Sequence, residues 1–368
     1  MAFGMDHIDT EFRRRINRLV KERRKSTLVN QTHDVRFSAT DIYYEFGQPL
    51  RRHVIVLLSA GCSIPTCTMC PFTNYNLFGT GEQPPDPVAQ VYRALRKREA
   101  QGVDIISLYN DGSFFADSEL GVEQRASIAQ LVNDANIPRL MVESLPQFIT
   151  PDRIEHFTRH LDAKLTVGIG LQSENDFIRQ VCVGTSFNKK QFELSLDVLN
   201  KYDVNAKIYV MVKPPFLGDG EAYHDVLSTS KYLMDLRVSN VTLCPTRVAD
   251  NTIVADLYRL GIYRPPHPCT VLACLRDSLS YVDSRVAMVN LTAKDFASIT
   301  SLSSEDKIAT GVFQALQSFD KSHRLKDLIL PGDLEQEFSE HRKDLITHSS
   351  QDLRINMKEM LHALEEER

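Results

Sequence analysis

Residues 53–70 read His53-Val-Ile-Val-Leu-Leu-Ser-Ala60-Gly-Cys62-Ser-Ile-Pro-Thr-Cys67-Thr-Met-Cys70. The first eight residues form a short apolar run with the length of a buried strand. Three cysteines follow directly, on a segment that holds Pro65 and is followed by Pro71. A strand that leads into such a loop predicts an α/β fold with its chemistry at the carboxyl end of the strand.

Five more strand-like runs follow along the chain, at residues 104–110, 139–144, 165–171, 206–212 and 240–244. Amphipathic stretches separate them at 88–96, 125–135, 190–202 and 222–236, each long enough for a crossover helix. This alternation predicts six βα units with a parallel sheet. Periodicity alone is compatible with a partial barrel and with an open, doubly wound sheet.

Polar residues at the strand ends favour the barrel. Asn110 and Asp111 follow the second run, Glu143 lies in the third, and Gln172 and Lys213 follow the fourth and fifth. In (β/α) barrels these ends together form the active site. We therefore predict a parallel (β/α)6 partial TIM barrel over residues 53–262, preceded by a basic helical segment over 1–52. The turn-rich residues 263–268 begin a mainly helical region over 263–368.

The composition argues against a membrane protein, a secreted protein and a disulfide scaffold. The 368 residues are 42% hydrophobic and 25% charged, with seven cysteines. The longest apolar run is far shorter than the roughly 20 residues of a membrane helix, and charge precedes any apolar stretch at the start, so we expect neither a membrane span nor a secretory signal. An odd number of cysteines does not indicate a disulfide scaffold. We expect a cytoplasmic protein.

The formal charge is −5, which disfavours a protein whose main partner is nucleic acid. Residues 11–25 nevertheless hold eight basic side chains (Arg13, Arg14, Arg15, Arg18, Lys21, Arg23, Arg24 and Lys25). This run predicts a solvated amphipathic helix that buries Phe12, Ile16, Leu19 and Val20. A phosphate-binding or RNA-facing helix is the alternative.

Cys62, Cys67 and Cys70 are candidate metal ligands. A structural zinc site needs a fourth ligand, yet no histidine lies between His53 and His156. Three thiolates without a fourth suit a [4Fe-4S] cluster with one open iron. Structural zinc and three buried thiols remain the alternatives.

The Cys-x4-Cys-x2-Cys loop resembles the cluster loop of radical S-adenosylmethionine (radical SAM) enzymes, whose commonest form has one residue fewer in the first gap. The order and spacing of further segments are similar to those of the radical SAM subunit of archaeosine synthase, and less closely to the radical SAM domain of the Elongator catalytic subunit. These segments are residues 109–115, 142–146, 169–174, 212–217 and 261–266. The resemblance covers about residues 53–275.

The resemblance implies the cofactors, a [4Fe-4S] cluster and SAM. In that family SAM chelates the open iron, and an electron from the cluster cleaves SAM to give a 5′-deoxyadenosyl radical. This radical takes a hydrogen atom from the substrate. A flavodoxin or ferredoxin-like protein would supply the electron. The resemblance further implies that Met69 packs against the adenine and that Asn110, Asp111, Gly112 and Ser113 bind the SAM amino group. An ordinary Asp-Gly turn is the alternative for the last four.

Three side chains have a predicted site role, and each has a structural alternative. Glu143 interrupts an apolar strand and would bind a ribose hydroxyl or the SAM ammonium; a buried ion pair is its alternative. Gln172 would contact SAM, while the adjacent Ser173 or Glu174 would cap the next helix. Lys213 would hold the SAM carboxylate or an acidic substrate group, or else form a surface ion pair. Glu143 and Lys213 are the candidate catalytic residues.

Cys244, Cys269 and Cys274 raise the question of a second cluster, although buried thiols are the simpler interpretation. Arg247 and Arg264 are candidate substrate contacts. A protein that only carries electrons would leave Glu143 and the Asn110 turn unexplained. We predict a small-molecule substrate, because the chain is acidic outside residues 11–25 and has no recognisable added RNA-binding domain. A tRNA base, the kind of substrate on which archaeosine synthase acts, is the alternative.

Overall fold

The computed structural model describes residues 7–23, 35–72, 77–78, 82–282, 287–299, 306–348 and 353–366. Its centre is one sheet of eight strands in the order β1 to β8. The strands are β1 Phe37–Glu45, β2 Gln48–Val56, β3 Ile105–Tyr109, β4 Arg139–Glu143, β5 Lys164–Gln172, β6 Asn205–Val212, β7 Asn240–Pro245 and β8 Met288–Asn290. β1 is antiparallel to β2, and β2 to β8 are parallel.

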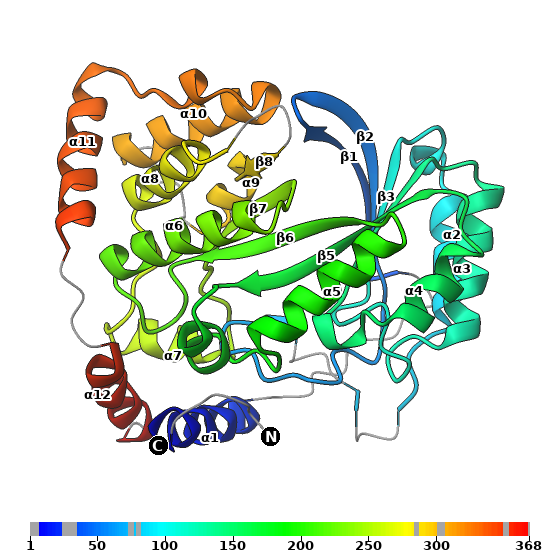
Figure 1. Ribbon diagram of the computed structural model, residues 1–368, viewed down its shortest axis with the longest axis horizontal. Coiled ribbons are helices and arrows are strands. Elements are labelled where there is room, and N and C mark those ends of the chain that lie inside the picture. The colour runs from blue at the N-terminus through cyan, green and yellow to red at the C-terminus, as the bar shows by residue number, and fades with distance from the viewer. Residues whose placement is uncertain are drawn as a thin grey trace.

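Helices surround this half-barrel (Figure 1). They are α1 His7–Arg23, α2 Pro87–Leu95, α3 Val122–Asp134, α4 Pro151–Thr158, α5 Lys189–Lys201, α6 Asp219–Asp235, α7 Ile253–Arg259, α8 Pro268–Leu279, α9 Ala293–Ala297, α10 Lys307–Ser322, α11 Gly332–Thr347 and α12 Leu353–Glu366. None of the helices in this part of the chain combines the length and the apolar composition that a bilayer crossing requires. The predicted parallel partial barrel is confirmed.

Two segments differ from the sequence prediction. Residues 37–52, expected to be helical, form the β1–β2 hairpin, whose turn residues Phe46 and Gly47 both have positive φ (47° and 72°). Such a two-residue turn matches the twist of paired strands and fixes their register. In the region expected to be mainly helical, β8 adds a seventh parallel strand. The proposed division of the chain at residues 52 and 262 remains a prediction.

Helix α1 buries the side chains that its periodicity predicted. Phe12, Ile16, Leu19 and Val20 belong to one buried cluster with residues of α7 and α12. α1 and α12, from opposite ends of the chain, lie side by side (Figure 1). The Arg15 guanidinium donates to both carboxylate oxygens of Glu365, at 3.1 and 2.7 Å, and ties the two helices together.

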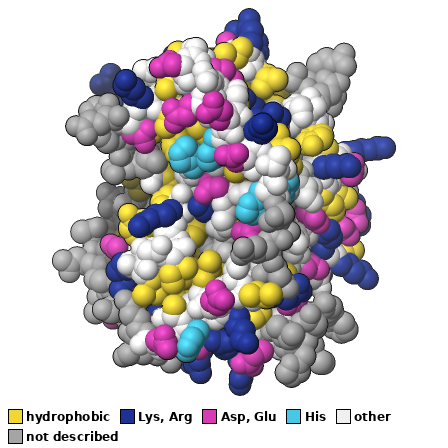
Figure 2. Space-filling model, turned by 90° about the vertical axis from the view of Figure 1, so that its left-hand side faces the viewer, with side chains coloured by type: hydrophobic (Ala, Val, Ile, Leu, Met, Phe, Trp, Pro, Cys, Tyr) yellow, Lys and Arg dark blue, Asp and Glu magenta, His cyan; other side chains and the backbone are white. Residues whose placement is uncertain are grey.

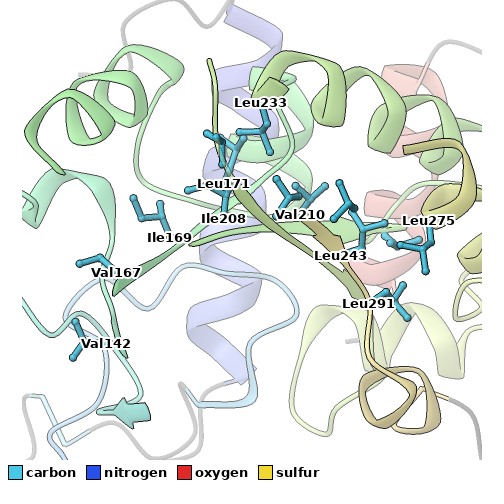
Figure 3. Close-up of a cluster of buried hydrophobic side chains, with 14 of the residues drawn as sticks. Val142, Val167, Ile169, Leu171, Ile208, Val210, Leu233, Leu243, Leu275 and Leu291 are labelled. Atoms are coloured by element: carbon cyan, nitrogen blue, oxygen red, sulfur yellow. The ribbon is translucent and has the colours of Figure 1, made fainter. Parts of the chain in front are cut away.

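Alternation along the strands separates an apolar outer face from a polar inner face. The outward side chains of the strands pack against side chains of the helices, such as Leu233 of α6 and Leu275 of α8 in Figure 3. The strand residues labelled there are Val142, Val167, Ile169, Leu171, Ile208, Val210 and Leu243. Their sequence neighbours, which point the other way, line the hollow of the half-barrel.

Candidate functional site

Two adjoining cavities occupy the inner face of the half-barrel. The upper chamber, of about 730 Å³, is lined by Met69, Cys70, Glu143, Gln172, Met211 and Arg247 among others. The lower chamber, of about 510 Å³, is lined by residues of β1, β2, β6, β7 and β8. Tyr209 and Cys244 line both. The cysteine loop therefore opens onto the hollow of the half-barrel, as the strand-end argument predicted.

The cysteine loop is anchored to the segment that follows β5. The Thr68 amide donates to the Val183 carbonyl at 2.9 Å, and the Thr68 hydroxyl donates to the Cys182 carbonyl at 2.7 Å. Cys62, Cys67 and Cys70 are half-buried, whereas Thr68 between them is 1% exposed. Backbone anchors of this kind hold the loop where Met69 and Cys70 line the upper chamber.

Gly184 permits this close approach. Its φ is +88°, and a Cβ added there would meet the Thr66 carbonyl oxygen at 2.3 Å and the Cys67 Cα at 3.4 Å. The Thr66 hydroxyl also donates to the Gly184 carbonyl at 2.6 Å. A side chain at this position would push the cysteine loop away, so the position requires glycine.

The predicted SAM turn after β3 lies against the same loop. A Cβ at Gly112 would meet the Cys62 Cα at 3.1 Å. Ser113 and Asn110 are buried, and the Asn110 Oδ1 atom has no hydrogen-bond partner among the described residues. Asp111, with φ of +55°, pairs with Arg36; burial raises its pKa to about 6, which Arg36 opposes.

Glu119 joins the two loops, and sequence reasoning missed it. Its carboxylate accepts hydrogen bonds from the amide and hydroxyl of Ser63, at 2.8 and 2.7 Å, and from the Ser113 amide. Burial raises its pKa, while these hydrogen bonds oppose the shift. Because Glu119 lies far from Ser63 in sequence, no local pattern could have indicated the bridge.

Glu143 faces the upper chamber, as predicted. It accepts a hydrogen bond from the Tyr209 hydroxyl; burial raises its pKa, and both this bond and the charge of Lys207 oppose the shift. Gly168, its ladder neighbour on β5, makes room for the pair, because a Cβ there would lie 2.9 Å from the Tyr209 ring and 3.0 Å from the Glu143 Cγ. The sequence signalled Glu143 but not Tyr209 or Gly168.

Gln172 also faces the upper chamber, at an irregularity of β5. The register shifts between Gly170 and Gln172, and Gln172 has φ of +69°. A Cβ at Gly170 would lie 2.5 Å from the Gln172 Nε2 atom, so glycine leaves room for the amide. The neighbouring Ser173 and Glu174 turn elsewhere: Ser173 donates to Asp225 at 2.6 Å, and Glu174 pairs with Lys189.

No family model matches the chain. Archaeosine synthase subunit beta of Methanosarcina acetivorans is 27% identical over 274 residues, covering 72% of this chain and 78% of that protein. Its namesake from Thermococcus kodakarensis is 24% identical over 229 residues, covering 60% and 69%. The crystal structure of methylornithine synthase matches 97% of both chains with a TM-score of 0.50 at 10% identity, which shows the same fold. These relatives support an enzyme of the radical SAM type, near archaeosine synthase subunit beta, as the cysteine loop and the later segments predicted.

The cofactors of radical SAM enzymes are a [4Fe-4S] cluster and SAM, and the donor set of this chain fits the cluster. Three cysteines are the ligands that leave one iron open. Among the described residues, no three His, Cys, Asp or Glu side chains are already gathered at metal-binding distance. Cys62, Cys67 and Cys70 would therefore turn toward a common centre as the cluster binds. The unpartnered Asn110 oxygen beside the loop is an acceptor suited to an ammonium group.

Arg13 contributes to the cluster loop of this radical SAM enzyme, a contact that sequence reasoning missed. Its guanidinium donates to the Gln180 carbonyl and, at 3.5 Å, to the Thr66 hydroxyl. Burial lowers its pKa, which its interaction with Cys67 opposes. One of the basic residues of α1 thus places a positive charge next to a predicted cluster ligand.

Lys213 does not line either chamber, and neither does the turn formed by Asn110, Asp111, Gly112 and Ser113. Lys213 has φ of +59°, is 5% exposed and pairs with Asp219 at the start of α6. Its ammonium lies 5.5 Å from the Tyr263 ring centre, and the Tyr263 hydroxyl donates to its carbonyl at 2.8 Å. The prolines after it do not direct the side chain to the cavity, because Asp219 holds it.

Of the remaining candidate residues, some line the upper chamber and others lie elsewhere. Arg247 and Cys244 line the upper chamber, whereas the Arg264 guanidinium lies over Tyr258, 5.2 Å from its ring centre. Cys269 and Cys274 are fully buried in α8, within the apolar cluster on the outer face of the sheet. Because Cys244 points to the inner face, the three thiols that suggested a second cluster are not brought together.

Proposed function

We propose that this radical SAM enzyme holds a [4Fe-4S] cluster with Cys62, Cys67 and Cys70, binds SAM in the upper chamber and abstracts a hydrogen atom from a small-molecule substrate. The observation that carries the proposal is that the cysteine loop opens, at Met69 and Cys70, into the chamber that Glu143 also lines. When bound, the cofactors supply an electron and a 5′-deoxyadenosyl radical.

The predicted SAM-binding residues have distinct tasks in this proposal; Met69, Glu143 and Gln172 line the upper chamber, and Asn110 lines a separate cavity of about 380 Å³ beside the cysteine loop. Met69 would pack its thioether against the adenine. The Asn110 oxygen would accept a hydrogen bond from the SAM ammonium, and Glu143 would accept one from a ribose hydroxyl. Gln172 would position the same molecule from the β5 side. Lys213, held by Asp219, would support the strand end rather than bind a carboxylate.

A small-molecule substrate is supported by the two chambers, which lie within the half-barrel. A modified tRNA base is the second candidate, and it is supported by the two relatives named archaeosine synthase subunit beta. The basic residues of α1 give it little support, since Arg13, Arg15 and Arg23 bind partners within the protein. Figure 2 shows acidic and basic side chains interspersed on one face of the molecule.

Anaerobic reconstitution tests this function. The protein would receive iron and sulfide, then SAM and a strong reductant, and 5′-deoxyadenosine would be measured by mass spectrometry. We expect product from the wild type and none from Cys67→Ala. Cys274→Ala is the matched control. It also removes a thiol, but from the buried core outside the cysteine loop, and should retain the activity. Assembly of zinc instead of an iron cluster would contradict the proposal.

The two substrate classes differ in their dependence on salt. Binding to tRNA releases counterions, so affinity would fall steeply between about 50 and 200 mM salt. A small molecule in the chambers would show a much weaker dependence. We expect no salt-sensitive tRNA retention on a filter. A flavodoxin or ferredoxin-like electron donor and a cytoplasmic location remain predictions.

A further inference from the structure

The lower chamber contains a buried ammonium group that, among the described residues, forms no direct ion pair, although its charge acts on the nearby Glu143 carboxylate. Lys207 of β6 is 5% exposed and lines this chamber. Its Nζ atom lies between two aromatic rings, 4.9 Å from the centre of Tyr43 and 5.5 Å from that of Tyr209. Among the described residues, none of the ion pairs or hydrogen bonds includes this ammonium. A buried charge without a partner is costly unless a ligand neutralises it.

Two buried acceptors with unused oxygens lie on the neighbouring strands. Thr242 of β7 and Asn290 of β8 are register partners, 4% and 2% exposed, and both line the lower chamber. Neither the Thr242 Oγ1 nor the Asn290 Oδ1 has a hydrogen-bond partner in the described part of the chain. Tyr209 is the register partner of Thr242 on its other side. These groups form a row across the inner face, beside Lys207.

Two other cations line the lower chamber. The Arg52 guanidinium donates to both carboxylate oxygens of Asp41, at 2.9 and 2.7 Å, and Lys294 is exposed, as is the adjacent Asp295. Asp320 also lines the chamber but carries no positive charge, so Lys207 is the buried cation there without an ion pair among the described residues. Unused buried hydrogen-bonding groups are rare in folded proteins, and two adjoining ones beside the Lys207 ammonium indicate a ligand.

We propose that the lower chamber binds the carboxylate of the substrate on Lys207, with Thr242 and Asn290 binding the hydroxyl or amine next to that carboxylate. The ligand is thus an α-hydroxy acid or an α-amino acid group. Tyr209, shared by both chambers, lies between this group and the upper chamber. The inference rests on the proposed function only in naming the ligand a substrate.

Ligand-detected saturation-transfer NMR tests the subsite with four probes: L-lactate, L-lactamide, L-alanine and L-alaninamide. The protein is used as purified without oxygen. We expect at least one acid to bind at millimolar concentration and its amide to bind at least tenfold more weakly, because the amide lacks the charge that Lys207 recognises. Preference for lactate or for alanine distinguishes the hydroxy from the amino acid.

Three variants make the result specific. Lys207→Met should lose at least tenfold in affinity for the acid, and Lys207→Arg should stay within a few-fold of the wild type. Lys231→Met, at an exposed position of α6, should bind as the wild type does. Melting temperatures establish that each variant is folded. Equal binding of acid and amide, no binding of any probe, or unchanged binding by Lys207→Met would overturn the proposal. If acids bind through Lys207 but 5′-deoxyadenosine never forms, the proposed function fails and the subsite stands.

Discussion

Gly184→Ala should prevent the cysteine loop from holding a cluster. The alanine Cβ would lie 2.3 Å from the Thr66 carbonyl oxygen, so this oxygen must retreat by about 1 Å to reach the ordinary contact distance of 3.4 Å. Functional groups need positions accurate to roughly 0.5 Å. A shift twice as large, at the residue before Cys67, should displace that thiol from the common centre.

The free-energy cost of Gly184→Ala has two parts, backbone strain and steric clash, which a control variant can separate. An alanine at φ of +88° costs about 1 to 2 kcal/mol through backbone strain, and overpacking against the carbonyl adds about 1 to 3 kcal/mol. Gly261→Ala is the matched control. Its φ is +75°, yet nothing lies within 4 Å of the added Cβ. The control should therefore show the strain without the clash.

The assay measures iron and sulfide per chain after anaerobic reconstitution, together with the melting temperature. We expect Gly184→Ala to retain little iron and Gly261→Ala to retain the wild-type amount. A Gly184→Ala protein with the iron content and melting temperature of the Gly261→Ala control would refute the reasoning, because the close approach would then have no consequence for the loop.

Three further perturbations test other parts of the site. Glu143→Gln should weaken SAM binding about tenfold with the cluster intact, because a charged acceptor is lost; equilibrium dialysis measures it, and unchanged affinity would remove Glu143 from the site. Arg13→Gln should lower iron retention, whereas Arg14→Gln, which changes a side chain 78% exposed, should not; iron analysis decides, and equal losses would contradict the bracing role. Burial raises the pKa of Asp225 to about 7, so its folded state binds a proton more tightly than the unfolded chain. Stability should fall by on the order of 1 kcal/mol from pH 6 to pH 8, and Asp225→Asn should abolish that fall in denaturant titrations; a persistent slope would show another titrating group.

Local patterns predicted those parts of the fold that depend on local sequence. The apolar runs located β3 to β7 within one or two residues, because strands buried by helices need uninterrupted outward side chains. The β1–β2 hairpin is not predicted, because the basic amphipathic run at residues 11–25 is extended to a helical segment over residues 1–52. A local signal is present nonetheless, since Gly47 ends a two-residue turn between the two strands.

The site residues likewise differ in whether local sequence indicates them or whether their role depends on tertiary contacts. Glu143 and Gln172 line the upper chamber, as expected for polar residues at the ends of parallel strands, and their site role stays a prediction. Lys213 follows the same rule, yet its ammonium pairs with Asp219 at the start of α6 and does not line the chambers, so its site role stays a prediction. Glu119 could not be found at all, because its role depends on two loops meeting in space. The position of a residue in a strand predicts the face of the sheet from which its side chain extends. Its tertiary partners determine where the charged group of that side chain lies.

The basic run of α1 shows how partners change the meaning of a charge pattern. Read as sequence, eight cations in fifteen residues resemble a phosphate-binding surface. In the structure, Arg15 and Arg18 pair with Glu365, Arg23 pairs with Asp256, and Arg13 supports the cysteine loop. These carboxylates come from α12 and α7, so the cations hold helices together around the mouth of the half-barrel. Within the described residues, four of these cations thus have structural partners, whereas Lys207 in the lower chamber forms no direct ion pair there and is the cation that we propose for a ligand.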